Sequence, residues 1–177
     1  MLDSVNFIQY IKDTWTYEEH PAKSLLVKEG ALARKLFYIE TGCCRCWFSS
    51  SDGKEVTMNF GFEGGFVSSM ESLISNEHSW YSVQTLEPTV VYSISLSKFK
   101  ELKVTTIELQ VAYSEYVEKR LLHYQKLFIA RIRDNPEKRY RELLAQYPEI
   151  IQRVPQHYIA SFLGITSVSL SRIRNRK

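Results

Sequence analysis

The sequence predicts an α+β fold with three parts in series: an antiparallel, jelly-roll-like β-roll, one long helix and a helix-turn-helix. Six of the seven glycines lie between residues 30 and 65, where they separate short apolar runs. Neither Gly nor Pro occurs from Val104 to Arg133. Near the C-terminus, small, glycine and apolar residues follow the spacing of two helices joined by a sharp turn. We therefore predict domains over residues 1–103, 104–133 and 134–177.

The β-roll is expected to follow a short amphipathic helix over residues 3–20, with Phe7, Tyr10, Ile11 and Trp15 on its apolar face. Glycines then recur at intervals of about eleven residues, which is typical of short antiparallel strands. Residues 51–53, Ser-Asp-Gly, are a hairpin turn signal. The expected strands cover residues 25–27, 36–39, 43–48, 56–60, 80–86 and 89–95.

The helix predicted over residues 104–133 is apolar on more than one side. Its apolar and aromatic residues are Ile107, Val111, Tyr113, Tyr116, Val117, Leu121, Tyr124, Leu127 and Phe128. The β-roll alone cannot bury all of these, so we expect the helix also to pack against its twin in a homodimer. The alternative is a single helix that lies on its own β-roll.

A further helix is expected to begin at Pro136, because Asn135 can cap it and proline suits the first helical position. Its apolar face carries Tyr140, Leu143 and Leu144. Two more prolines bracket the connector that leads to the helix-turn-helix.

The helix-turn-helix begins near Gln156. Ala160 is small where two helices must approach closely, and Gly164 occupies the turn, where a positive φ is needed. Thr166 can cap the second helix with its hydroxyl group. The apolar residues that would close the angle between the helices are Ile159, Leu163, Ile165, Leu170 and Ile173.

The outward face of the second helix carries hydroxyl, guanidinium and amide groups, which match base edges and phosphates in the DNA major groove. The predicted DNA-binding residues are Thr166, Ser167, Val168, Ser171, Arg172, Arg174, Asn175 and Arg176. The alternative is an ordinary pair of helices with a solvated basic face.

The distribution of charge supports a nucleic-acid-binding C-terminus. Residues 1–130 hold 13 Lys and Arg against 16 Asp and Glu, a net charge of −3, whereas residues 131–177 hold 10 against 4, a net charge of +6. A basic end on an acidic body is expected of a protein that binds nucleic acid. No apolar run approaches about 18 residues and the N-terminus lacks the features of a signal peptide, so a cytoplasmic location is expected.

The cysteines do not predict a metal site. Cys43, Cys44 and Cys46 lie within one expected strand, so Cys43 and Cys44 point to opposite faces, and neither a second Cys pair nor a nearby His completes a set of ligands. Buried or half-buried reduced thiols are the expected state. The four histidines are scattered, and neither a nucleophile elbow nor a phosphate-binding loop is present. We therefore expect neither an enzyme nor a cofactor.

Several motifs resemble the Crp/Fnr family of bacterial transcription regulators across nearly the whole chain. They are Arg139-Tyr140, Pro148, IASFLGIT at 159–166 and LSRIR at 170–174, with FYIETG at 37–42, DGKE at 52–55 and FEGGF at 62–66. The resemblance implies a cyclic-nucleotide-binding-type β-roll, a dimerisation helix and a winged helix-turn-helix. It also implies double-stranded DNA, a second copy of the chain and RNA polymerase as partners.

The resemblance does not extend to the ligand. Family members that bind cyclic AMP carry Gly-Glu and, about ten residues on, Arg-Ser, so that the Arg pairs with the phosphate. Here these pairs fall on Ser68-Ser69 and Ser79-Trp80, without either charge. Cyclic AMP is therefore not the expected effector, and the pocket either binds another small molecule or is vestigial. Its candidate residues are Phe66, Ser68, Ser69, Ser79, Trp80 and Tyr81, although simple core packing is the favoured role of the three aromatic ones.

The DNA-reading helix departs from the family as well. Val168 replaces the Glu with which many members contact cytosine, which leaves Arg172 as the main candidate for a contact to guanine. The sequence ends soon after this helix, so the β-wing is expected to be reduced or absent. Phosphate contacts are then expected from Arg153, Arg174, Arg176 and Lys177.

Two functions follow from these observations. The first is a dimeric DNA-binding transcriptional regulator with an unidentified small-molecule effector. The second is a degenerate family member that binds a protein or a small ligand and no longer binds DNA, which the shortened wing and Val168 would favour.

Overall fold

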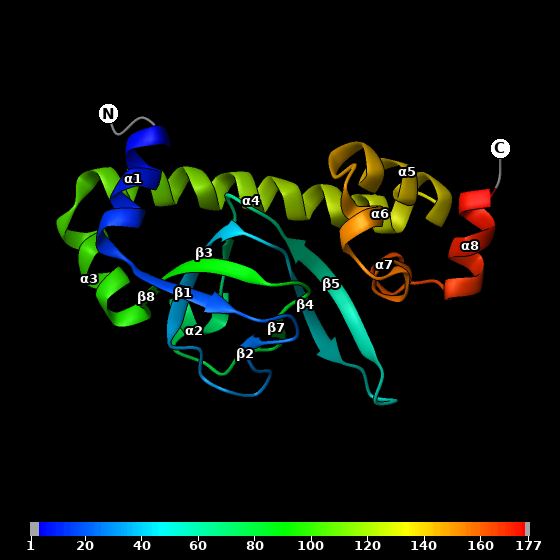
Figure 1. Cartoon of the computed structure of the whole chain (residues 1–177), viewed down its shortest axis with the longest axis horizontal. Helices are drawn as coiled ribbons and strands as arrows, with labels where there is room; N and C mark the ends of the chain where they lie inside the picture. Colours follow the sequence, from blue (N-terminus) through cyan, green and yellow to red (C-terminus); the bar gives the residue numbers. More distant parts are fainter. Residues whose placement is uncertain (1–3, 176–177) are drawn as a thin grey trace.

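A computed structural model describes residues 4–175 of the chain. Its strands form two antiparallel four-stranded sheets, with the orders β1-β8-β3-β6 and β2-β7-β4-β5. These sheets enclose an apolar interior to which Phe37, Ile39, Val83 and Val91 contribute, and together they make the predicted β-roll (Figure 1). The strands are β1 Thr16–His20, β2 Leu25–Val27, β3 Lys35–Thr41, β4 Cys44–Ser49, β5 Glu55–Gly61, β6 Phe66–Val67, β7 Ser82–Thr85 and β8 Thr89–Ser95.

The N-terminal helix is shorter than predicted. Helix α1 spans Ser4–Thr14, and the residues from Thr16 to His20 form β1, which pairs with β8. The prediction of one helix over residues 3–20 is therefore wrong for its C-terminal part. Pairing with a strand more than 60 residues further along the chain overrides the local helical pattern, because β8 supplies backbone hydrogen bonds that the segment cannot make alone.

The other predicted strands are confirmed, with boundaries that shift by a few residues. The turn at residues 51–53 joins β4 to β5 as expected, and Gly53 has a φ of +77°. Three short elements were not predicted, because each is too brief for periodicity or is specified by capping. These are β6, the helix α2 Met70–Ser75 and the helix α3 Leu96–Thr105.

The three cysteines are free and buried, as predicted. Burial raises the pKa of Cys43 to about 12 and that of Cys46 to about 11, and it raises the pKa of Cys44 as well. All three thiols therefore stay protonated at neutral pH and act as small apolar side chains.

The long helix is α4, Ile107–Arg133, and it runs along one side of the β-roll (Figure 1). It begins a little later than expected because Thr106 is extended, with φ −123° and ψ 104°, and separates it from α3. Leu109 is fully buried near its start. Although α4 has 27 residues, neither it nor any other helix among residues 4–175 is apolar enough to cross a membrane.

Four helices follow α4 within the described residues, and Figure 1 shows them gathered at its C-terminal end. The side chain of Asn135 caps α5 as predicted, by accepting a hydrogen bond of 2.9 Å from the Lys138 N–H. The helices share a core in which Cys43 and Phe60 of the β-roll also take part. Their bounds are α5 Pro136–Gln146, α6 Ile150–Arg153, α7 Gln156–Leu163 and α8 Ser167–Asn175.

Candidate nucleic-acid interface

Helices α7 and α8 form the predicted helix-turn-helix. Gly164 ends α7 with a φ of +67°, and its N–H donates to the carbonyls of Ala160 and Ser161. The hydroxyl of Thr166 accepts a hydrogen bond of 3.1 Å from the Ser169 N–H and so caps α8. Ala160 is only 2% exposed and lies in the same core cluster as Leu170 of α8, as expected of a small residue between the two helices. The local sequence therefore specifies this turn as expected.

Gly164 also leaves room for a side chain from the long helix. The Arg131 Nη1 donates a hydrogen bond of 2.8 Å to the carbonyl of Phe162, near the C-terminus of α7. A Cβ at position 164 would lie 2.8 Å from the Arg131 Nη2. The turn of the helix-turn-helix is thus tied to the end of α4.

We expect Gly164→Ala to lower the free energy of unfolding by about 1–2 kcal/mol, measured by urea denaturation. About 1 kcal/mol comes from placing alanine at a positive φ, and the rest from losing the Arg131 hydrogen bond. The matched control is Gly53→Ala, because Gly53 has a similar φ of +77° and a Cβ there would meet nothing within 4 Å. Equal losses in the two variants would show that the Arg131 contact contributes nothing.

The predicted reading face of α8 is exposed. Val168 is 61% exposed, while Leu170 on the opposite side is fully buried. Figure 1 places α8 at the end of the molecule, away from the β-roll. The other predicted DNA-binding residues that are exposed are Thr166, Ser167, Ser171, Arg172, Arg174 and Asn175. Arg176 and Lys177 lie outside the described residues.

Arg153 does not match its predicted role in binding phosphate. Its guanidinium donates to both Glu63 carboxylate oxygens, at 3.0 and 2.6 Å, and to the Glu87 carboxylate at 3.0 Å. Both glutamates belong to loops of the β-roll, and they hold the Arg153 side chain against the β-roll. No local sequence pattern shows that two acidic loops of the β-roll meet α6.

The β4–β5 hairpin of the β-roll binds α7. The Ser161 hydroxyl accepts a hydrogen bond of 2.9 Å from the Thr57 N–H and donates one of 3.2 Å to the Glu55 carbonyl, so it continues the edge of β5. Arg45 of β4 is only 2% exposed, pairs with Glu55, and stacks on the ring of Tyr158 at 3.8 Å. These contacts hold the helix-turn-helix in one orientation on the β4–β5 hairpin.

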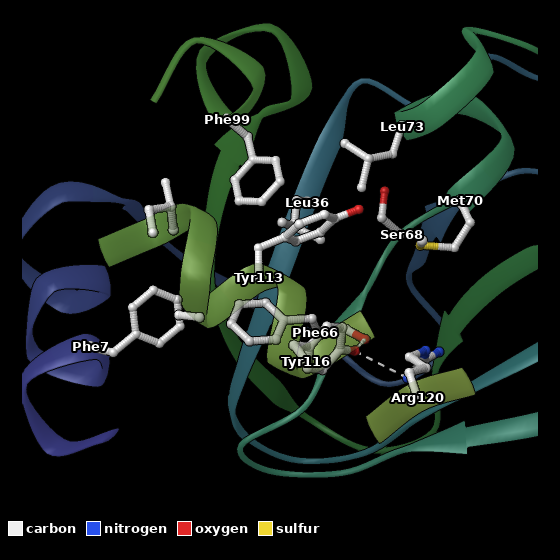
Figure 2. Close-up of a pocket in the computed structure, with 12 residues that line it drawn as sticks. Phe7, Leu36, Phe66, Ser68, Met70, Leu73, Phe99, Tyr113, Tyr116 and Arg120 are labelled. Atoms are coloured by element: carbon white, nitrogen blue, oxygen red, sulfur yellow. Dashed lines mark hydrogen bonds between the residues drawn. The ribbon is translucent and has the colours of Figure 1, made fainter. Parts of the chain in front are cut away.

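The predicted effector residues do not converge on one cavity. Phe66 and Ser68 line a small cavity of about 40 Å³ between the β-roll and α4 (Figure 2). Ser69 instead caps α2 by accepting from the Ser72 N–H at 3.2 Å, and Ser79 donates to the Tyr81 carbonyl at 2.7 Å.

The remaining two predicted effector residues differ in burial. Tyr81 is buried and donates a hydrogen bond of 2.7 Å to the Ser68 carbonyl. Trp80 is 68% exposed, so the prediction that it packs in the core is wrong. The local sequence pattern does not distinguish Trp80 from Tyr81. Both residues lie in a bend directly before β7, where the regular alternation of a strand has not yet begun.

Arg120 of α4 also lines this cavity, and the sequence did not predict it as a site residue. Its guanidinium donates to the phenol oxygens of Tyr116 and Tyr124, at 3.2 and 2.8 Å, and Figure 2 shows the first of these bonds. Burial raises the pKa of Tyr116, which keeps its hydroxyl protonated and able to donate to the Phe66 carbonyl. The sequence does contain a signal for this cluster, because Arg120 is four residues from both Tyr116 and Tyr124 and so lies on the same face of the helix.

The β-roll matches a known family of domains. Residues 17–105 match the sequence profile of the cyclic nucleotide-binding domain. The curated proteins named cAMP-activated global transcriptional regulator CRP, from Salmonella typhimurium and from Klebsiella aerogenes, are each 24% identical over 103 residues, which make up 58% of this chain and 49% of theirs. The chain therefore spans about half the length of the curated relatives it matches.

Solved structures resemble the chain over more of its length. FixK2 from Bradyrhizobium japonicum superposes with a TM-score of 0.78 at 16% identity, covering 91% of this chain and 83% of that one. The c-di-GMP responsive global regulator CLP from Xanthomonas campestris superposes with a TM-score of 0.74 at 17% identity, covering 97% and 89%. At these identities the likeness establishes the fold. The chain thus belongs to the cyclic nucleotide-binding domain family, with the overall fold of the Crp/Fnr transcriptional regulators.

Proposed function

We propose that this chain is a dimeric, sequence-specific DNA-binding regulator of transcription. The observation that carries the proposal is the exposed face of α8, with Ser167, Ser171 and Arg172 on a correctly capped helix-turn-helix. Hydroxyl and guanidinium groups on such a helix fit the donor and acceptor pattern of the major groove. Arg172 is the group that pairs with guanine, and Arg174 contacts phosphate.

The dimer forms through α4. Starting from Ile107, alternate steps of four and three residues along α4 define a row of side chains, named here the α4 seam. Every side chain of this row is exposed in the single chain. This spacing is that of a coiled coil, whose apolar positions become buried only when a second helix packs against them. The α4 seam comprises Ile107, Val111, Ser114, Glu118, Leu121, Gln125, Phe128 and Ile132.

Residues 1–103 act as the sensor, residues 104–133 as the dimerisation helix and residues 134–177 as the DNA-binding domain. The effector differs from cyclic AMP, because both charged positions of the phosphate-binding pattern are serine. Ligand binding shifts α4 relative to its partner helix and so changes the spacing of the two α8 helices. RNA polymerase is the partner that such a regulator would engage.

A salt series on duplex DNA tests the proposal. A fluorescent duplex is selected from a random library, and binding of the full chain to it is followed by anisotropy. The KCl concentration is varied from about 50 to about 300 mM, because each phosphate contact of a DNA-binding protein releases about 0.9 counterions and so makes the affinity depend on salt. We expect a steep loss of affinity with salt. Failure to bind any duplex at the lowest salt, by a protein that remains dimeric, would instead favour the interaction module.

A further inference from the structure

A groove of about 800 Å³ lies between the β-roll, α4 and the helix-turn-helix. Its walls come from the β4–β5 hairpin, the C-terminal half of α4, and helices α5 and α7, which meet beside one another in Figure 1. Apolar side chains that include Met58, Leu127 and Phe162 line it. This volume is in the range that holds a small molecule. The groove and the cavity at Phe66 share no lining residue in the described part of the chain.

The charge of the groove is positive. Among its described lining residues, the cations are Lys119, Lys126, Arg131 and Arg139, whereas Glu142 is the acid. The field reaches His123, which also lines the groove: burial lowers its pKa, and Arg120 and Lys126 lower it further. An anion placed here would therefore be attracted by several groups at once.

Among the cations of the groove, Arg139 has a donor without a hydrogen-bond partner in the described part of the chain. The Arg139 Nη2 donates to the Leu163 carbonyl at 2.8 Å, but its Nε is buried and without a hydrogen-bond partner among residues 4–175. Burial lowers the pKa of Arg139, and the neighbouring Arg131 lowers it further, which is the repulsion expected of two cations held together. A buried guanidinium donor left unpaired is unfavourable, and a rotation of the Arg139 side chain toward an acceptor in the groove, which Arg139 lines, would relieve it.

We propose that this groove binds an amphiphilic anion: a small molecule with an apolar body and one carboxylate, sulfonate or phosphate group. The anionic group lies near Arg139 and Lys126, and the apolar body packs on Met58 and Phe162. Arg131 and Arg139 both hold the C-terminus of α7. A bound anion would therefore act on the orientation of the helix-turn-helix. An effect of this on DNA binding rests on the proposed function, whereas the binding of the anion does not depend on it.

Two fluorescent probes with the same apolar body test the site in the full chain. 1-Anilinonaphthalene-8-sulfonate carries a sulfonate, and N-phenyl-1-naphthylamine is its neutral counterpart. We expect Lys126→Glu to weaken binding of the sulfonate by about tenfold, since one charge-assisted contact is lost, with little effect on the neutral probe. Glu142→Gln, which removes the acid, is expected to strengthen sulfonate binding about twofold to fivefold.

Ala130→Trp fills the groove from α4 without a change in charge, and it is expected to abolish the binding of both probes. The matched control is Lys28→Glu, an equal charge reversal at an exposed position of the β-roll, which should leave both affinities unchanged. Circular dichroism and urea denaturation confirm that each variant is folded. Binding of the sulfonate that is insensitive to Lys126→Glu, Glu142→Gln and Ala130→Trp overturns the proposal.

A second outcome also overturns it. If the wild-type dimer binds neither probe while a variant made monomeric at Val111 and Leu121, two residues of the α4 seam that do not line the groove, binds both, a second copy of the chain covers the groove. The DNA affinity is measured in parallel, so that loss of probe binding with intact DNA binding refutes the groove alone. Probe binding without DNA binding refutes the proposed function and leaves the groove in place.

Discussion

Glutamate at both Leu121 and Phe128 is expected to convert the proposed dimer to a monomer at micromolar concentration. The two side chains are 58% and 68% exposed in the single chain, and both belong to the α4 seam. Burial of each contributes about 1.5–3 kcal/mol, and the substitution would also force carboxylates against each other. We expect the dissociation constant of the dimer to rise by more than about 100-fold, measured by sedimentation equilibrium.

The matched control for this experiment is Ile74→Glu. Ile74 is 67% exposed, like Phe128, but it lies on α2 and not on α4. It should leave the dimer intact. A double variant that stays dimeric would show that the two copies meet through another surface. In the proposed dimer, two linked α8 helices would bind two half-sites together, so the monomer is also expected to lose most of its DNA affinity.

Arg172→Ala is expected to weaken binding to the selected DNA site by about 1–3 kcal/mol, or roughly 5- to 150-fold, with little change in binding to unrelated DNA. The reason is that a guanidinium on the exposed face of α8 can donate two hydrogen bonds to guanine, and alanine can donate none. Anisotropy with the selected duplex and with a scrambled duplex measures both affinities.

Arg141→Ala is the control for this loss of charge, because Arg141 is exposed on α5, where it pairs with Glu137. Arg174→Ala offers a second comparison. If Arg174 contacts phosphate, its substitution should weaken binding to both duplexes alike and make the dependence on salt shallower. Equal losses on the two duplexes for Arg172→Ala would falsify its role in reading a base.

The parts that local chemistry governs were predicted closely. Asn135 caps α5, Thr166 caps α8, and Gly164 adopts a positive φ. Each of these depends on residues within a few positions along the chain, so the sequence contains the whole cause. Six of the eight described strands, all except β1 and β6, were predicted for the same reason, since their alternation and their turns are local patterns.

Most of the errors involve contacts between distant segments. The strand β1 needs β8 as a partner, and Arg153 needs two loops of the β-roll. The effector residues were chosen by analogy of position, and the fold directs most of them elsewhere: Ser69 to a helix cap and Trp80 to solvent. Arg120 was missed because its importance comes from the tyrosines and the cavity that surround it.

By itself, the sequence determined the order of the three parts, the helix-turn-helix and the residues that its reading helix exposes, because turns, caps and apolar periodicity act over a few residues. Only the tertiary structure decided which charged groups are free to act. It holds Arg153 between Glu63 and Glu87, buries Arg45 against Tyr158, and leaves the Nε of Arg139 unpaired at the wall of a groove. The physical reason is that burial and pairing of a charge depend on segments brought together from far apart, and no local pattern records them.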